Sequence, residues 1–521
     1  MASMLKTALP LSLVSGLLLA LSFPGGPALW PLLFVAFVPL LLTVQKGTGR
    51  QALWCGLATG FVHFVLLLYW IIIVLGRYGG LPWFISLPAL VLLAFYMALY
   101  VAIFAGGARL LLRSKAPLAA LWALPALWVG LDWLRGALFS GFPWMDPGYG
   151  LWQQPMFIQT ADLFGHHGIT FIIVLVNSLV AILVNWQGRF GKKGWIWPTA
   201  SVLLLLITVG GYSLERWQQI EKELVLADHL PVGIVQGNID QSIKWSPAQQ
   251  EKTVAGYVQQ TASFFTPAKN GPRPTLVVWP ETALPFYPAD NPLVEELRAL
   301  SGQYDMALLT GAPWYEVVDR TNRTFKYFNS ALLLAPTGEF VGRYEKSHLV
   351  PFGEYVPLKP FLPFLAPLVE SVGDFSPGTV EQPLVWQKAR IGALICFESI
   401  FPDIARKWVQ AGANVLVNLT NDAWYGKSSA PYHSLAMSVF RSVETRRSLV
   451  RSANTGFSGF VDPLGRVQLC SGLFEPWAAS AEVALRDEVT FWVRYGFLFA
   501  PFCLVVSALL IVAVRRRSNT D

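Results

Sequence analysis

The sequence predicts a multi-span helical membrane domain joined to an α/β domain. Hydrophobic residues make up 54% of the 521 residues and charged residues only 14%, whereas a soluble domain carries about 25% charged residues. Apolar stretches long enough for membrane helices fill the N-terminal part and recur near the C-terminus. Between them lies one long polar block, in which strand-like runs alternate with helix-like patterns. These observations predict a membrane domain at 1–217, an α/β domain at 218–488 and a final helix with a basic tail at 489–521.

Eight stretches approach the roughly 20 apolar residues that a membrane helix requires. Seven precede the polar block and one follows it, so both chain ends are expected on the same side of the membrane. The first stretch follows Lys6 as in a signal peptide, but it lacks a small-residue cleavage site, and we expect a retained span. The predicted spans are 7–23, 28–45, 52–76, 82–112, 117–134, 166–186, 195–213 and 492–514.

Lysine and arginine concentrate in the loops after the even-numbered spans and in the C-terminal tail. The positive-inside rule places such loops in the cytoplasm, together with both termini. The polar block follows the seventh span and is therefore expected outside, in the periplasm of a bacterium with an inner and an outer membrane. The net charge of +7 then reflects topology, not a nucleic-acid surface. The residues concerned are Lys46, Arg50, Arg109, Arg113, Lys115, Arg189, Lys192, Lys193 and Arg515–Arg517.

The polar block has the pattern of an α/β domain. Apolar residues at helical spacing predict helices at 400–411 and 431–448. A turn at Asp462–Gly465 predicts a hairpin within 458–469. The other strand-like runs are 232–239, 275–282, 307–312, 329–336, 390–398 and 413–422.

Three residues of the polar block could together make and break an acyl thioester. Cys396 ends an apolar strand ahead of a helical pattern, where the helix dipole would lower the pKa of its thiol and make it a nucleophile. Glu281 ends another strand and could act as the general base. Lys346 could stabilise a tetrahedral oxyanion. Taken singly, each has a simpler reading, a buried cysteine and two solvated charges.

Other kinds of site lack their sequence signatures. The chain has no G-x-S-x-G motif of serine hydrolases, no phosphate-binding loop and no dinucleotide glycine motif. His166 and His167 are adjacent, which is poor geometry for one metal ion, so we expect neither a metal nor a cofactor. Cys55 and Cys503 lie in apolar runs, so the four cysteines do not predict a disulfide framework.

The three motifs occur in a recognisable order. Glu281 lies in VVWPETALP, Lys346 follows it by 65 residues, and Cys396 in IGALICFES follows by a further 50. With NLTNDAWYGKS at 418–428, this order resembles the nitrilase superfamily of carbon–nitrogen hydrolases, which use a Glu-Lys-Cys triad on an αββα sandwich. The whole chain resembles the membrane-embedded branch of that superfamily, the apolipoprotein N-acyltransferases. Further matching segments are SGFPW (140–144), VQGNIDQSIKW (235–245), LVPFGEYVPL (349–358) and RSANTGFSG (451–459).

The resemblance implies a reaction and a site. Cys396 would take an acyl chain from a membrane phospholipid, phosphatidylethanolamine above all, and pass it to the N-terminal amine of a diacylglyceryl-cysteine apolipoprotein. Glu281 would be the base and Lys346 the oxyanion partner. The family often has tyrosine after the nucleophile, where this chain has Phe397. The resemblance also implies substrate-pocket roles for four residues, Trp245, Glu354, Glu398 and Trp424.

The stretch after Lys346 suggests a lipid substrate independently. It is rich in proline and large apolar residues, among them Phe361, Leu362 and Phe364. We expect a lid that dips into the membrane and guides an acyl chain, with an interior loop as the alternative. We expect the enzyme to act as a monomer.

Two other functions remain open at this point. A membrane-tethered amidase would use water as the acceptor, but one span would be enough to anchor it. A transporter with an outer binding domain would carry ionisable residues inside several spans. Spans one to four have few such residues, with His63 the exception.

Overall fold

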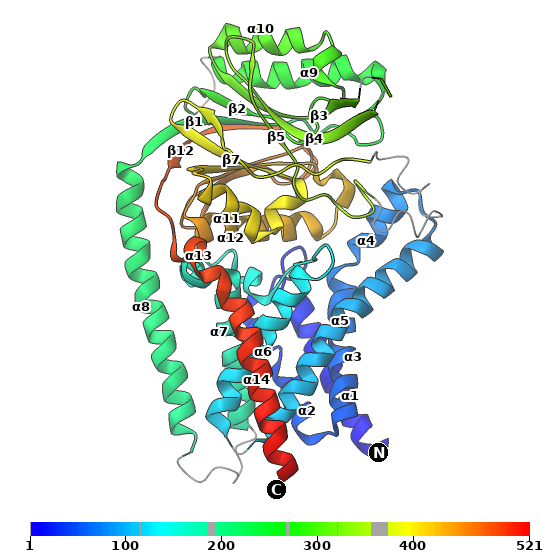
Figure 1. Cartoon of the computed structure of the whole chain (residues 1–521), viewed down its shortest axis with the longest axis vertical. Coiled ribbons are helices and arrows are strands. Elements are labelled where there is room, and N and C mark those ends of the chain that lie inside the picture. The colour runs from blue at the N-terminus through cyan, green and yellow to red at the C-terminus, as the bar shows by residue number, and fades with distance from the viewer. Residues whose placement is uncertain are drawn as a thin grey trace. The chain divides into compact units, whose positions relative to one another are not determined.

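The computed structural model describes residues 2–114, 116–184, 194–266, 271–319, 321–322, 324–355 and 374–520. The chain divides into two compact units (Figure 1). The first comprises Met1–Gln219, Ser428–Phe440 and Arg494–Asp521, and the second comprises Ile220–Lys427 and Arg441–Val493. The C-terminal segment therefore belongs to the same unit as the N-terminal helices.

The first unit is built from helices. Five helices in the described part of the chain are long and apolar enough to cross a membrane: Gly49–Leu67, Trp83–Arg113, Ala161–Val184, Ile196–Leu226 and Gly496–Arg516. Large apolar side chains such as Trp83, Leu92 and Ile207 lie exposed on them, as expected for surfaces that contact lipid. The helices are α1 (Ala2–Leu21), α2 (Val38–Lys46), α3 (Gly49–Leu67), α4 (Trp70–Ile73), α5 (Trp83–Arg113), α6 (Pro117–Ala137), α7 (Ala161–Val184), α8 (Ile196–Leu226) and α14 (Phe499–Thr520).

Several predicted spans differ from these helices. The prediction at 28–45 corresponds to a short turn, Trp30–Phe34, and the nine-residue α2, which has Pro39 in its first turn, where proline is tolerated. The prediction at 52–76 is interrupted, because α3 ends at Leu67 before α4 and a π-helical turn, Val74–Tyr78. The total of eight spans stays a prediction.

The second unit contains two six-stranded sheets (Figure 1). The first sheet has the order β12-β1-β2-β3-β4-β5, with β1, β2 and β3 parallel and the other pairs antiparallel. Its strands are β1 (Asp228–Gln236), β2 (Leu276–Val278), β3 (Ala307–Asp319), β4 (Thr324–Leu334), β5 (Phe340–Glu345) and β12 (Trp477–Leu485).

The second sheet has the order β11-β10-β9-β8-β7-β6. Here β7, β8 and β9 are parallel and the other pairs antiparallel, so this sheet repeats the pairing pattern of the first. Its strands are β6 (Leu384–Trp386), β7 (Ala389–Ile395), β8 (Val415–Thr420), β9 (Leu449–Ala453), β10 (Gly459–Val461) and β11 (Val467–Cys470).

The two sheets lie face to face, with helices outside them (Figure 1). The Ser452 hydroxyl on β9 donates to the carbonyls of Val235 and Val278 on β1 and β2, at 3.4 and 3.2 Å. Helices α9 (Pro247–Ala262) and α10 (Val294–Tyr304) share a hydrophobic core with the first sheet. Helix α11 (Pro402–Gln410) packs on β7. The predicted αββα sandwich is the architecture of this unit.

The predicted strands were incomplete. Strand β2 ends at Val278 rather than 282, because Trp279-Pro280 follows and proline cannot donate a ladder hydrogen bond. Strands β5, β6, β9 and β12 were missed. Strand β9 contains Arg451 and Ser452, whose complete burial conceals it from a hydropathy pattern.

Candidate active site

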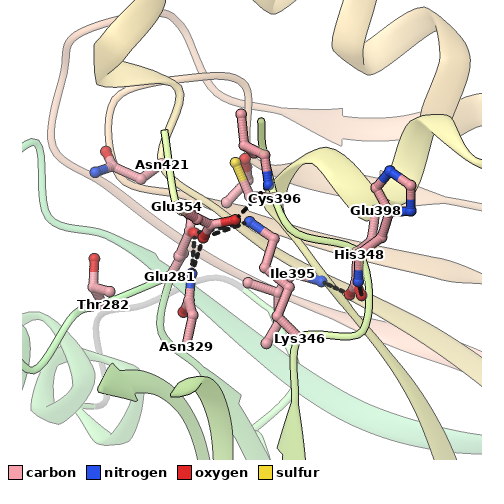
Figure 2. A network of polar contacts seen from close by, with 12 residues as sticks. Glu281, Thr282, Asn329, Lys346, His348, Glu354, Ile395, Cys396, Glu398 and Asn421 are labelled. Carbon is pink, nitrogen blue, oxygen red and sulfur yellow. Dashed lines mark hydrogen bonds and ion pairs between the residues drawn. The ribbon is translucent and has the colours of Figure 1, made fainter. Parts of the chain in front are cut away.

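The three proposed catalytic residues follow the ends of three strands and converge (Figure 2). Glu281 comes three residues after β2, Cys396 directly after β7 and Lys346 directly after β5. Strands β2 and β7 belong to the parallel parts of the two stacked sheets. The sandwich therefore gathers at one place residues that are far apart in the sequence, as the open ends of parallel strands commonly do.

A hydrogen-bonded network joins the carboxylates to the lysine (Figure 2). The Lys346 ammonium lies 2.9 Å from Glu354 Oε1 and 3.8 Å from Glu281 Oε1. The amide nitrogen of Asn329, on β4, donates to both carboxylates, at 2.8 Å to Glu281 and 2.9 Å to Glu354. The backbone N–H of Val350 donates to the other Glu354 oxygen at 2.8 Å. Each carboxylate is thus held by fixed donors before any substrate binds.

The turn that carries Glu281 approaches the neighbouring strand closely. Thr282 has φ = 46°, in the left-handed region that few non-glycine residues adopt. Gly311 on β3 lies directly beneath, where a Cβ atom would come within 2.4 Å of the Thr282 nitrogen and 2.6 Å of the Glu281 Cα. A glycine at position 311 is therefore required for Glu281 to sit where it does.

Cys396 occupies a sharp turn. It has φ = 53° between strand β7 and a short 3₁₀ turn, Cys396–Ile400, and such strain in a non-glycine residue is typical of functional positions. Its side chain is half-buried. Burial raises the pKa of the Cys396 thiol, the Glu281 carboxylate raises it further, and Lys346 lowers it. The expectation that a helix dipole would lower this pKa is wrong, because desolvation and the nearby carboxylate outweigh the cation.

Lys346 is held in its charged form. It is buried, with a relative exposure of 1%. Burial alone would lower the pKa of Lys346, but the carboxylates of Glu354 and Glu281 raise it above its usual value. The site therefore holds a charged ammonium close to a thiol whose pKa is raised.

Glu398 lies among hydrogen-bond donors from the ends of two strands. It is completely buried, and its Oε1 accepts from the Tyr344 hydroxyl at 2.7 Å and from the Ser347 N–H at 2.7 Å. Its Oε2 accepts from the Ile395 N–H at 2.8 Å. These contacts tie the end of β5 to the end of β7, and hence Lys346 to Cys396. Glu398 therefore holds together the two segments that carry Lys346 and Cys396.

The other predicted pocket residues lie in two loops. Trp245 is 47% exposed in the loop between β1 and α9, where an aromatic side chain can meet a substrate. Trp424 is half-buried in the turn Asp422–Tyr425 after β8. The proposed lid residues Phe361, Leu362 and Phe364 lie outside the described residues.

Sequence reasoning missed three members of the site. Lys244 is completely buried and donates to the Glu281 carbonyl and the Thr282 hydroxyl. It lies in the segment VQGNIDQSIKW, which matches the family, but a lysine within a polar motif gives no signal of burial. Asn329 joins the two glutamates. Asp422, which accepts from Thr420 and Arg451, contributes a negative charge near the Cys396 thiol.

A cluster in the first unit corrects the expectation about histidine geometry. The ring nitrogens Nε2 of His166 and His167 lie 2.9 and 3.7 Å from Asp146 Oδ2, and the three ligand atoms lie within 4.8 Å of one another. The backbone at Gly165 (φ = 65°) breaks the helix and allows this convergence. Asp146 also pairs with Arg135, so its charge is already balanced by a cation.

A cavity of about 510 Å³ lies elsewhere in the second unit. Its lining includes Glu221, His229, Asp462 and Arg466, and it contains none of the predicted site residues. The chemistry of the triad therefore belongs to a different place on this unit.

Comparisons with known proteins agree with both parts of the chain. Residues 15–179 match the model of the apolipoprotein N-acyltransferase N-terminal domain, and residues 231–487 match that of the carbon–nitrogen hydrolases. The apolipoprotein N-acyltransferase of Geobacter metallireducens is 41% identical over 98% of this chain and 95% of its own length. That of Methylococcus capsulatus is 32% identical over 99% of this chain and 97% of its own. A nitrilase-superfamily amidase from Nesterenkonia aligns with 51% of this chain and 94% of its own, at 18% identity and a TM-score of 0.37. On the strength of the two full-length relatives, the chain belongs to the apolipoprotein N-acyltransferase family.

Proposed function

We propose that this protein transfers an acyl chain from a membrane phospholipid to the N-terminal amine of a diacylglyceryl-cysteine apolipoprotein, through a thioester on Cys396. The observation that carries the proposal is the convergence of Glu281, Lys346 and Cys396 in a chain of this family. The apolar helices support a substrate that resides in the membrane. The reaction is an N-acyl transfer in two half-reactions.

In the first half-reaction Cys396 becomes acylated. Glu281 removes the thiol proton as the sulfur attacks the ester carbonyl of the phospholipid. The Lys346 ammonium stabilises the negative charge that develops on the carbonyl oxygen. The ester C–O bond then breaks, and Glu281 returns the proton to the departing oxygen. The products are the acyl thioester and a lysophospholipid.

In the second half-reaction the acyl group moves to nitrogen. The α-amino group of the apolipoprotein attacks the thioester carbonyl, and Glu281 accepts a proton from that nitrogen. The C–S bond breaks, an amide forms, and the proton returns to the sulfur. Because the pKa of the Cys396 thiol is raised, the regenerated nucleophile is held as the neutral thiol until the next donor arrives.

The proposal includes a location and a route for the lipid. We place residues 1–217 and the C-terminal helix in the inner membrane, residues 218–488 in the periplasm, and both termini in the cytoplasm. Trp245, Glu354, Glu398 and Trp424 are proposed to shape the substrate pocket. Phe361, Leu362 and Phe364 are proposed to form a lid that enters the outer leaflet and guides the acyl chain. Phosphatidylethanolamine is the proposed donor, and the proposed active form is a monomer.

Mass spectrometry of the purified protein tests the function. After exposure to phosphatidylethanolamine vesicles, the peptide that contains Cys396 should gain the mass of one acyl group. A diacylglyceryl lipopeptide with a free amine should discharge it and appear as the triacylated product. A lipopeptide whose amine is acetylated is the matched control and should leave the thioester in place.

An amidase that uses water is the competing reading, since residues 231–487 match the carbon–nitrogen hydrolase model. It predicts rapid release of free fatty acid whether or not the lipopeptide is present. That outcome, or the absence of any adduct on Cys396, would overturn the proposed function.

A further inference from the structure

A second buried lysine lies beside the triad. Lys244 has no exposed surface, and its ammonium donates to the Thr282 hydroxyl at 2.7 Å and to the Glu281 carbonyl at 3.2 Å. Burying an ammonium is costly unless partners compensate for the lost hydration. The compensating partners here are the Glu281 carbonyl and the Thr282 hydroxyl, which belong to the proposed active site.

The segment that carries Lys244 is anchored along its length. The backbone of Ile239 exchanges two hydrogen bonds with the Asn454 side chain, at 2.9 and 2.8 Å. The Asn421 side chain, shown in Figure 2, donates to Gln241 at 2.7 Å. Lys244 itself closes a turn, with its N–H 3.1 Å from the Asp240 carbonyl. The ammonium is therefore delivered by a segment that other contacts already fix.

The turn that receives this ammonium is strained. Thr282 has φ = 46°, and the Glu281–Thr282 peptide is pressed against Gly311 on β3. The Lys244 ammonium holds this turn with two hydrogen bonds, one to the Glu281 carbonyl and one to the Thr282 hydroxyl. Any relaxation would move the Glu281 carboxylate relative to Cys396.

The charge of Lys244 also reaches the reacting groups. Glu281 and Cys396 are the acidic groups that face it, and both favour its charged form. Against them, burial lowers the pKa of Lys244 to about 8. Lys346, whose pKa is raised, lies 3.8 Å from the Glu281 carboxylate. The site thus contains one permanent cation and one that can lose its proton slightly above neutral pH.

We propose that Lys244 is a positioning residue for acyl transfer: its buried ammonium fixes the Glu281–Thr282 turn and supplies a second positive charge beside Cys396. This inference rests on the proposed function only for the identity of the acyl donor. It assigns to Lys244 an action through Glu281, not a contact with substrate. Its neighbour Trp245, exposed on the same segment, is held by the same anchor.

The test compares Lys244→Met, which keeps the length of the side chain without its charge, with the wild type in the full-length protein. Single-turnover formation of the Cys396 thioester from phosphatidylethanolamine vesicles should slow by about 100-fold, the usual effect of displacing a catalytic group by about 1 Å. Lys252→Met, at an exposed position on α9, is the matched control and should stay within about twofold.

Two further readouts separate positioning from a structural role. The ratio of the wild-type to the Lys244→Met rate should fall as the pH rises through about 8, because the wild-type lysine is protonated below its pKa and loses its charge above it. In a Glu281→Gln background, Lys244→Met should cost much less than in the wild type, since both act through one group. A ratio that is independent of pH, together with additive losses, would overturn the inference.

The inference stays testable if Lys244→Met does not fold. Thr282→Ala removes one acceptor of the ammonium and should slow acylation about tenfold; an unchanged rate would count against Lys244. Where Lys244→Met does fold, alkylation of Cys396 by iodoacetamide gives a readout that requires no lipid. It should be slower than in the wild type at pH 7, because the thiolate loses a nearby positive charge. If alkylation is slower in Lys244→Met but the wild-type protein forms no acyl adduct, the proposed function is refuted and the role of Lys244 is retained. A normal adduct and normal alkylation in Lys244→Met would refute the role of Lys244 alone.

Discussion

The two sheets of the second unit have the same pairing pattern but contribute different chemistry. In each sheet three parallel strands are flanked by antiparallel ones. The first sheet provides the carboxylate, Glu281 after β2, and the ammonium, Lys346 after β5. The second provides the thiol, Cys396 after β7, and a further carboxylate, Asp422 after β8. Glu281 and Asp422 thus follow corresponding strands.

The environments of these two carboxylates differ. Glu281 lies 3.8 Å from the Lys346 ammonium and accepts a hydrogen bond from the neutral amide of Asn329. Asp422 pairs with the Arg451 guanidinium at 2.9 Å, and both are completely buried. Corresponding places in the two sheets therefore differ in their partners: the proposed base contacts an ammonium and a neutral amide, whereas Asp422 forms a buried ion pair.

Replacing the nucleophile gives the largest expected effect. Cys396→Ala should abolish the thioester, because no other side chain of the site can form one. The measurement is mass spectrometry of the active-site peptide after exposure to phospholipid. Cys470→Ala, at an exposed cysteine of the same sheet, should retain the adduct. An adduct that persists in Cys396→Ala would place the nucleophile elsewhere.

Replacing the proposed base, Glu281, should change two rates in opposite directions: thioester formation should slow and alkylation of Cys396 should speed up. Glu281→Gln should slow thioester formation by about 10²–10⁴-fold, the usual contribution of a general base. The same change should speed alkylation of Cys396, because the Glu281 carboxylate raises the pKa of the thiol and its removal lowers that pKa. Stopped-flow acylation and iodoacetamide kinetics measure the two rates. If both rates fall together, the site has collapsed and Glu281 is structural.

The corresponding change in the second sheet should affect stability rather than catalysis. Asp422→Asn breaks a buried ion pair and should cost about 3–5 kcal/mol in the free energy of unfolding. Alkylation of Cys396 should speed up, because Asp422 also raises the pKa of the thiol, while acylation per folded molecule stays within about tenfold. Denaturant unfolding and active-site titration separate the two quantities. If Asp422→Asn slowed acylation as much as Glu281→Gln does, the two carboxylates would not differ in their importance for catalysis.

The smallest effect is expected at the contact between the sheets. Tyr344→Phe removes one of several donors to Glu398 and should cost about 1 kcal/mol, seen as a severalfold slower acylation. The remaining backbone donors should keep Lys346 close to Cys396. Glu398→Gln is the stricter comparison and should be worse, because one oxygen is exchanged for a nitrogen that faces N–H groups. If the two changes had equal effects, the contacts of Glu398 would not be what holds the ends of β5 and β7 together.

The sequence predicted the arrangement of the catalytic residues better than their electrostatics. Cys396 and Glu281 follow apolar runs that hydropathy identifies as strands. Lys346 follows β5, which has no such run, and it was identified from its sequence motif. The raised pKa of the Cys396 thiol could not be predicted, since it depends on the distance to Glu281 and on the density of the surroundings. A local rule, the helix dipole, gave the wrong sign for this reason.

Buried polar residues account for most of what was missed. Strand β9 contains Arg451, and its burial depends on Asp422 and Asn418, which are about thirty residues away in the chain. Lys244 is buried because its partners come from the turn after β2. In the membrane part, the interrupted prediction at 52–76 shows that apolar composition alone does not keep a helix continuous past Leu67.

Glu281 can occupy its position only because residue 311 is a glycine and has no Cβ atom. A single methyl group there would meet the backbone of Glu281 and Thr282 at less than 3 Å. The geometry of the proposed site therefore depends on a residue that has no side chain of its own. Anyone who reshapes this pocket for other acyl donors can vary the loops around it, but must treat position 311 as closed to every larger residue.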